Sequence, residues 1–233
     1  MMKGRPITGE EFDRLLKKVA KVVGQAAAES WLHYLRGLWW SGLRLEESLE
    51  LYWDRDDRLC VDLTHKFPML YIPAELEKGH QDRLLPIAPE FAEFLLATPE
   101  DERTGRVFRP MAKRAGAPLP KAHRVGELVS AIGKAAGVKV QTDSQTGKVK
   151  FASAHDLRRS FGCRWAPRVM PQVLMELMRH ESIETTLKYY VGLNAERTAE
   201  VLYAAVSGNT SPVSAPGHDE APSETVAPTG LSK

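Results

Sequence analysis

The segment from Ser153 to Tyr190 constrains this chain more than any other part of it. Its sequence, SAHDLRRSFGCRWAPRVMPQVLMELMRHESIETTLKYY, holds two histidines, several arginines and a tyrosine pair within fewer than forty residues. No other stretch is as rich in side chains that can bind or react with a phosphate. The first question is therefore how this segment would present those groups.

Local signals divide the segment into three helices. Ser153, with an aspartate three residues later, predicts a helix N-terminus, and His155 and Arg158 then share one helix face because they are three residues apart. Pro167 predicts the end of this helix, and Pro171 predicts the first turn of a second one that stops near His180. A third helix, capped by Ser182, is predicted to carry Tyr189 and Tyr190.

The run HDLRRSFG, then LMRH, then a tyrosine nine residues after that histidine resembles the tyrosine recombinase (phage integrase) family. The positions that match the family pattern are His155, Arg158, His180, Thr185, Thr186 and Tyr189. Arg179 departs from the pattern, because the family usually has glycine there. The family's spacing selects Tyr189 over Tyr190 as the nucleophile, which the chemistry of two adjacent tyrosines does not decide.

Two further segments match the same family. Ser41–Glu47 (SGLRLEE) resembles its first arginine box, Thr-Gly-Leu-Arg-x-x-Glu, which makes Arg44 the first phosphate-binding arginine. Lys78-Gly79, followed by Arg83, fits the hairpin that carries the family's catalytic lysine. Taken alone, Arg44 would be an ordinary surface residue and Lys78 an exposed lysine in a turn, so both assignments rest on the resemblance.

These residue types suit attack on a phosphodiester. Negative charge grows on the non-bridging oxygens during attack, and the guanidiniums of Arg44 and Arg158 can each bind two of those oxygens while staying charged. A tyrosine, with an ordinary pKa of about 10, needs a nearby base or a positive field to act as a nucleophile. The candidates for proton transfer are His155 at the nucleophile and Lys78 at the leaving 5′ hydroxyl, while His180 can hydrogen-bond the phosphate. The expected product is a 3′ phosphotyrosine, which needs neither ATP nor a metal ion or other cofactor.

The fold that these signals and the resemblance predict is α+β. It is mostly α-helical, with a small antiparallel β-sheet, like a tyrosine recombinase catalytic domain. The predicted strands are Leu59–Leu63, Leu70–Ile72 and Arg83–Ile87, and the polar run between the last two predicts a turn. The predicted catalytic domain covers residues 1–206, and residues 207–233, with few large apolar side chains, are expected to be a disordered tail.

The charge distribution favours a polyanionic partner. The whole chain has a net charge of +2, but residues 101–191 hold 17 Lys/Arg against 8 Asp/Glu. This basic excess favours double-stranded DNA, and an ordinary solvated basic face is the alternative. The irregular stretch from Thr98 to Pro120 supplies further candidates for contacts to the DNA backbone, namely Arg103, Arg106, Arg109, Lys113 and Arg114.

The chain opens with no signal peptide, and no apolar segment is long enough to span a membrane. Its two cysteines, Cys60 and Cys163, lie far apart and indicate a reducing compartment. With a DNA partner, the expected location is cytoplasmic and associated with the nucleoid.

The resemblance also implies an assembly, usually a homo-tetramer on paired DNA sites. The family normally has a separate N-terminal DNA-clamping domain, for which this chain leaves no room, so a fragment, a degraded element or a naturally short enzyme is expected. Two alternatives to a site-specific recombinase or integrase stay open. One is a type IB topoisomerase, which uses similar residues to relax DNA, and the other is a non-catalytic DNA-binding remnant. The DNA target sequence, the direction of the reaction and the host are not specified by the sequence.

Overall fold

The computed structural model describes residues 4–76, 80–112, 118–190 and 203. The chain divides into two compact units, Met1–Gly192 and Leu193–Lys233, and every described residue except Tyr203 belongs to the first. The predicted tail over residues 207–233 lies outside the described residues. Among the helices that are described, none combines the length and the apolar character that crossing a bilayer requires.

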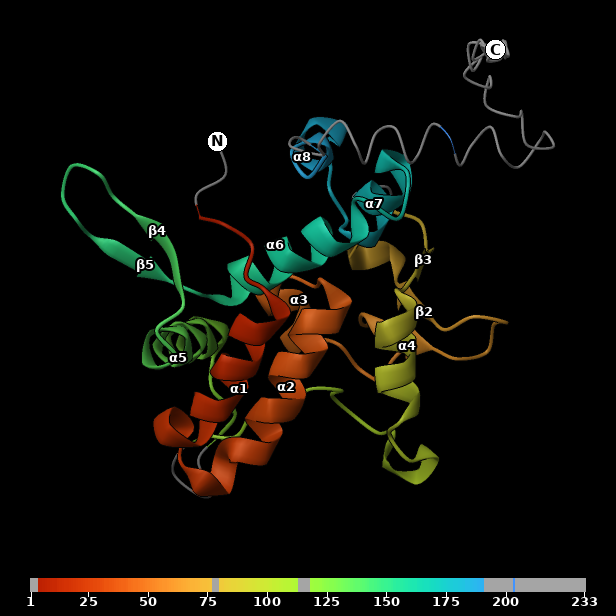
Figure 1. Cartoon of the computed structure of the whole chain (residues 1–233). Coiled ribbons are helices and arrows are strands. Elements are labelled where there is room, and N and C mark those ends of the chain that lie inside the picture. The colour runs from red at the N-terminus through yellow and green to blue at the C-terminus, as the bar shows by residue number, and fades with distance from the viewer. Residues whose placement is uncertain (1–3, 77–79, 113–117, 191–202, 204–233) are drawn as a thin grey trace, which may run out of the picture. The chain divides into compact units, whose positions relative to one another are not determined.

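Helices account for most of the regular secondary structure of the first unit (Figure 1). Helix α2 (Ala28–Ser41), preceded by the short 3-10 helix η1 (Gln25–Ala27), packs against α1 (Gly9–Val23), α4 (Pro89–Leu96) and α6 (Ala154–Trp165). Helix α5 (Ala122–Ala135) packs against α1 and α3 (Leu45–Leu49). Their apolar faces share one core, whose largest fully buried side chains include Trp31, Tyr34, Phe91 and Phe108. The predicted helical majority is confirmed.

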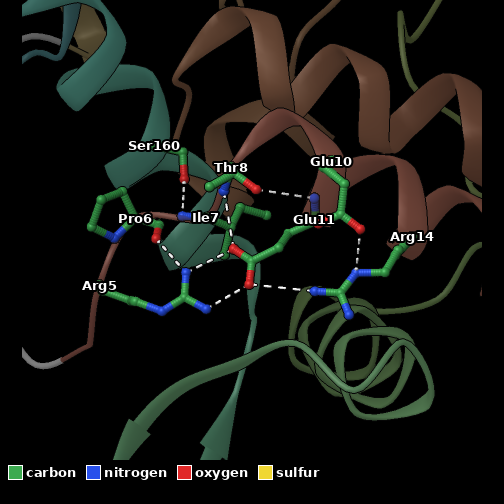
Figure 2. Close-up of polar contacts among 8 residues, drawn as sticks. All are labelled: Arg5, Pro6, Ile7, Thr8, Glu10, Glu11, Arg14 and Ser160. Carbon is green, nitrogen blue, oxygen red and sulfur yellow. Dashed lines mark hydrogen bonds and ion pairs between the residues drawn. The ribbon is translucent and has the colours of Figure 1, made fainter.

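The N-terminal segment ties α1 to α6, as Figure 2 shows. The backbone N–H of Ile7 donates to Ser160 Oγ at 2.8 Å, so residues before α1 are fixed to the helix that carries His155 and Arg158. Thr8, followed three residues later by Glu11, predicts a capping box, and α1 begins there: each side chain accepts from the other residue's backbone N–H. Arg5 and Arg14 both pair with the Glu11 carboxylate, and Arg5 does so at 2.5 Å.

The first unit also holds a three-stranded antiparallel sheet, in the order β1 (Cys60–Asp62), β2 (Met69–Ile72), β3 (Arg83–Pro86). Leu70 pairs with Leu85, and both point into the core, as the alternation along the strands requires. A 3-10 turn, η2 (Ala74–Leu76), follows β2, and another, η3 (Glu100–Glu102), follows α4. A separate hairpin of β4 (Lys139–Thr142) and β5 (Val149–Phe151) leads into α6. The predicted small antiparallel sheet is confirmed.

Helix α3 is shorter than the sequence indicates. After the break at Gly42, the sequence predicts a helix from Arg44 to about Tyr52, but α3 ends at Leu49. Tyr52 instead donates its N–H to Leu59 O at 2.9 Å and forms bridges with Cys60 and Arg106. Tertiary strand-like pairing therefore overrides the local helical pattern at this point.

The C-terminal helices of the unit follow the proline signals with one correction. Helix α6 ends before Pro167, and α7 (Pro171–Leu177) starts at its proline. The third helix, α8 (Ile183–Leu187), is capped by Ser182 as predicted, but it ends before the tyrosines, which lie in the turn that follows. Tyr189 and Tyr190 pack against a second, smaller core cluster, made of Ala88, Phe161, Ala166, Leu174 and Met178.

Candidate active site

Helix α6 positions His155 and Arg158 on the same face. Asp156 fixes the start of the helix, because its Oδ2 accepts from the backbone N–H of Ser153 at 3.0 Å and from its hydroxyl at 2.6 Å. With the helix started there, His155 and Arg158 both line a hollow of about 440 Å³. Arg44 lines the same hollow, so residues more than a hundred positions apart in the sequence meet there.

Two backbone carbonyls aim the Arg158 guanidinium. Arg158 is 6% exposed, and its two terminal nitrogens donate to the carbonyls of Gly42 and Met178. Gly42 has a φ of 62°, in the left-handed region that glycine adopts most readily, and it ends α2 just before Arg44. Burial, followed by the charge of Arg44, lowers the pKa of Arg158 to about 10, so the guanidinium is still a cation at neutral pH.

Arg44 lies at the start of α3 and is more exposed than Arg158. Its Nη1 donates to Glu47 Oε1 at 2.7 Å, and its Nη2 donates to the backbone carbonyl of Arg179 at 2.8 Å. The turn at Met178 and Arg179 therefore supplies carbonyls to both arginines. Since neither contact involves the remaining face of the Arg44 side chain, which is 46% exposed, a phosphate can still reach it.

His180 follows that turn and is oriented by α8. Its Nδ1 is hydrogen-bonded to the hydroxyl of the buried Thr186 at 2.9 Å, so its other ring nitrogen, Nε2, is the one that can face a substrate. Burial, then the charges of Arg158 and Arg44, lowers the pKa of His180 to about 4. The imidazole is accordingly neutral at physiological pH and can act as either donor or acceptor.

The two adjacent tyrosines have different surroundings. The Tyr189 ring stacks on His180, with ring centroids 5.8 Å apart, and Tyr189 is close enough to Arg158 for each to affect the other's ionisation. Tyr190 instead donates its hydroxyl to the carbonyl of Val169 at 2.7 Å. Burial raises the pKa of Tyr189, and the charge of Arg158 opposes that rise. The resting hydroxyl is therefore protonated and has to lose its proton during attack.

The absence of a side chain at Gly162 on α6 lets the Tyr189 ring pack against the helix. A Cβ at this position would lie 2.5 Å from Tyr189 Cε1 and 2.7 Å from Met178 Sδ, both far inside van der Waals contact. The tyrosine ring thus packs directly over the helix backbone, one turn beyond Arg158.

Gly162→Ala is expected to move the Tyr189 ring and lower the rate constant for DNA cleavage by about 100-fold, because small misplacements of a reacting group have effects of that size. Single-turnover cleavage of a nicked duplex measures this. Gly9→Ala is the matched control, because a Cβ on Gly9 would meet nothing within 4 Å. Unchanged cleavage in Gly162→Ala would contradict the placement of Tyr189.

A second hollow, of about 460 Å³, adjoins the first at Arg44. Its lining brings together cationic groups from α3, β3 and the turn before His180, and consists of Arg44, Leu76, Arg83, Met175, Glu176, Arg179, His180 and Glu181. A phosphodiester backbone that crosses Arg44 would meet Arg158 on one side and Arg83 on the other, and two glutamates also line each hollow. An arginine on each side of Arg44 suits an extended polyanion.

Of the six residues predicted for the site, five are described. The structure brings Arg44, His155 and Arg158 to one hollow. His180 lines the adjoining hollow with Arg44, and Tyr189 stacks on His180. Lys78 lies outside the described residues, so its predicted role stays a prediction. Glu47 and Gly162 were given no role from the sequence, although both lie inside the matching motifs.

The basic loop between α4 and α5 holds three described arginines that the sequence offers as candidates for DNA contacts, and all three are bonded within the protein. Arg103 donates to the carbonyls of Thr98 and Leu96, and Arg109 donates to those of Arg106 and Thr104. The remaining described arginine, Arg106, pairs with Glu50 at 2.6 Å and with the Tyr52 hydroxyl at 3.0 Å. These arginines hold the loop in place, while Lys113 and Arg114 lie outside the described residues.

The depressed pKa of His180 makes a prediction about stability. The unfolded histidine titrates near about 6.5, so between that pH and about 4 the unfolded state binds more protons than the folded one. The stabilisation is complete above the unfolded value and is lost as the pH falls toward 4. The melting temperature of the parent protein should therefore fall between pH 7 and pH 5. The melting temperature of the His180→Gln variant should fall less steeply over the same range. Equal slopes in the two proteins would contradict the low pKa.

Residues 5–197 match the Phage integrase family, which is most of the chain. No match was found among curated proteins.

Among solved structures, the catalytic domain of bacteriophage HP1 integrase is 16% identical, with a TM-score of 0.51, and the match covers 90% of this chain and 100% of that one. The Tn1549 transposon integrase, in complex with transposon right end DNA, is 18% identical with a TM-score of 0.55, over 88% of this chain and 67% of that one. XerA recombinase is 18% identical with a TM-score of 0.50, over 87% of this chain, which spans 64% of XerA. At these identities the likeness is one of fold, and it agrees with the predicted α+β recombinase architecture. With the family match over residues 5–197, it follows that the chain belongs to the phage integrase family.

Proposed function

We propose that this protein breaks and rejoins double-stranded DNA by site-specific recombination through a 3′-phosphotyrosyl intermediate. The observation that carries the proposal is the meeting of Arg44, Arg158 and His180 beside Tyr189, from segments far apart in the chain. Two guanidiniums, a neutral imidazole and a tyrosine together fit the needs of phosphodiester attack better than any other chemistry in the described residues.

The proposed first step is an in-line displacement at phosphorus. The Tyr189 hydroxyl oxygen forms a bond to phosphorus while the bond from phosphorus to the 5′ oxygen breaks. Arg44 and Arg158 hold the non-bridging oxygens, on which negative charge grows, and His180 donates a hydrogen bond to one of them through Nε2. Because burial raises the pKa of Tyr189, its proton must leave during attack, and His155 is the proposed acceptor.

The second half of the proposed step concerns the leaving group. The 5′ oxygen gains a proton and departs as a hydroxyl, and Lys78 is the proposed acid by its place in the sequence motif. The phosphotyrosine conserves the energy of the broken bond, so a 5′ hydroxyl from another strand can attack it and release Tyr189. The proposed cycle requires neither ATP nor a metal ion.

The proposed partner is double-stranded DNA, bound by a homo-tetramer on paired sites near the nucleoid. The arginines that line the hollows on both sides of Arg44 support a DNA partner. Two of the similar folds were solved with DNA, the Tn1549 integrase with transposon right end DNA and XerH with a palindromic difH substrate. The tetramer is proposed from the family resemblance alone.

Strand transfer in the presence of a chelator tests the proposal. The protein is first incubated with nicked duplexes of randomised sequence, without ATP and with EDTA, and then with a second duplex that carries a free 5′ hydroxyl. The expected result is a covalent adduct that disappears as a joined strand forms. Relaxation of supercoiled plasmid without exchange between duplexes would instead indicate topoisomerase activity. Salt-sensitive binding with no adduct would indicate a non-catalytic DNA-binding protein.

A further inference from the structure

Arg179 has a backbone conformation that is unfavourable for an arginine. Its φ is 50°, and His80 is the other residue with a side chain that has a positive φ in the described part of the chain. Left-handed backbone is unfavourable for any residue with a Cβ, and glycine, which the family usually has here, would avoid that cost. The side chain of Arg179 is therefore expected to make an interaction that offsets it.

That interaction is with Glu47. The Nη1 atom of Arg179 lies 3.4 Å from Glu47 Oε1, and the Nη1 atom of Arg44 lies 2.7 Å from the same oxygen. The side chains of Glu47 and Arg179 are each 17% exposed, so the pair is mostly shielded from solvent. Two guanidiniums thus share one carboxylate oxygen.

Arg179 reaches Arg44 by a second route. Its backbone carbonyl accepts a hydrogen bond from Arg44 Nη2 at 2.8 Å. Arg44 is consequently held at both ends of its fork, by Glu47 on one side and by the Arg179 carbonyl on the other. The Nη1 atom of Arg179 is buried and makes no hydrogen bond within the described residues, so its link to Glu47 is an ion pair at 3.4 Å.

The shared carboxylate also affects the net charge beside Arg44. Burial alone would raise the pKa of Glu47, but the charge of Arg179, followed by the contacts with Arg44, holds it below its usual value. If Arg44 were the only partner of Glu47, the ion pair would neutralise the cation that has to bind phosphate. With Arg179 present, the three groups carry a net positive charge, and Glu47 can orient Arg44 without cancelling it.

We propose that Arg179 is a positioning residue for DNA cleavage, which holds Glu47 from the side opposite Arg44 and so fixes Arg44 as a charged phosphate ligand. This role rests on the proposed function. It is distinct from a direct contact with DNA, because the guanidinium acts through Glu47.

A double-mutant cycle separates these roles. The single-turnover cleavage rate constant and the DNA dissociation constant are measured for the parent protein, Arg179→Gly, Glu47→Gln and the double variant. Arg179→Gly is expected to lower the cleavage rate constant about tenfold with an unchanged dissociation constant, because residues in one ion-pair network couple by energies of that order. In the Glu47→Gln background the same change should have less than about a twofold effect. Arg179→Lys should retain most of the parent rate, because lysine keeps a cation beside the Glu47 carboxylate.

Stability is checked with a matched backbone control. His80→Gly relieves the same left-handed strain at a site without this ion pair. Arg179→Gly relieves the strain but also removes the ion pair with Glu47, so its melting temperature should rise less than that of His80→Gly.

Three results would overturn the inference. Equal losses of rate in both backgrounds would show that Arg179 does not act through Glu47. A larger DNA dissociation constant in Arg179→Gly would indicate a direct DNA contact. An unchanged cleavage rate constant in this variant would limit Arg179 to a structural role. If the parent protein formed no adduct at all, the proposed function itself would fail, and that outcome is distinct from the other three.

Discussion

Replacing Tyr189 by phenylalanine is expected to abolish the covalent protein–DNA adduct completely while DNA binding persists. The substitution removes only the hydroxyl that would form the bond to phosphorus, and the ring can keep its stacking on His180. The measurement is a denaturing gel of the protein incubated with nicked duplexes, together with a binding titration at fixed salt concentration.

Tyr190→Phe is the matched control for this prediction. It removes the hydrogen bond from the Tyr190 hydroxyl to Val169 O, which is worth about 1 kcal/mol of stability, and it should leave the adduct in place. The structure distinguishes the two hydroxyls, because that of Tyr190 is already bonded to the backbone. Loss of the adduct in Tyr190→Phe, with adduct formation retained in Tyr189→Phe, would reverse the assignment.

The second large effect is expected for Arg158→Lys, which keeps the charge and removes the planar fork. Arg158 donates to two carbonyls, Gly42 O and Met178 O, and a lysine cannot reach both while also binding a phosphate. The cleavage rate constant should fall by about 100- to 1000-fold, the range found when a donor that stabilises a transition state is removed. Single-turnover kinetics at saturating DNA measure this fall.

Arg168→Lys serves as the control for Arg158→Lys. Arg168 follows the same helix, but its side chain is 54% exposed and pairs with Glu90 at 3.1 Å. Cleavage should be unchanged in this variant. A circular dichroism spectrum of each protein checks that the fold is retained, because the Gly42 and Met178 carbonyls lose a buried donor in Arg158→Lys. Near-normal cleavage by Arg158→Lys would contradict the bidentate role.

The elements of the fold could be predicted wherever local chemistry decides them. Thr8 and Ser153 mark helix starts that the structure confirms, and Pro171 begins α7 as expected. The errors occur where tertiary contacts override the local pattern. Tyr52 leaves the helical pattern to pair with Cys60 and Arg106, so α3 ends early.

The sequence predicts candidate residues for the site but not the contacts among them. The motifs identify Arg44, Arg158, His180 and Tyr189, and the structure brings them together. They do not show that Glu47 is shared by Arg44 and Arg179, because that contact joins positions more than a hundred residues apart. The need for a glycine at position 162 likewise depends on where Tyr189 packs after the chain has folded.

The most direct test of the central claim is to map the adduct by mass spectrometry. The protein is incubated with nicked duplexes in EDTA, so that the cleaved end diffuses away, and the covalent complex is digested and sequenced. The account predicts a single modified peptide, with the nucleotide joined to Tyr189 through a 3′ phosphate. A nucleotide on any other residue, or joined through a 5′ phosphate, would contradict it.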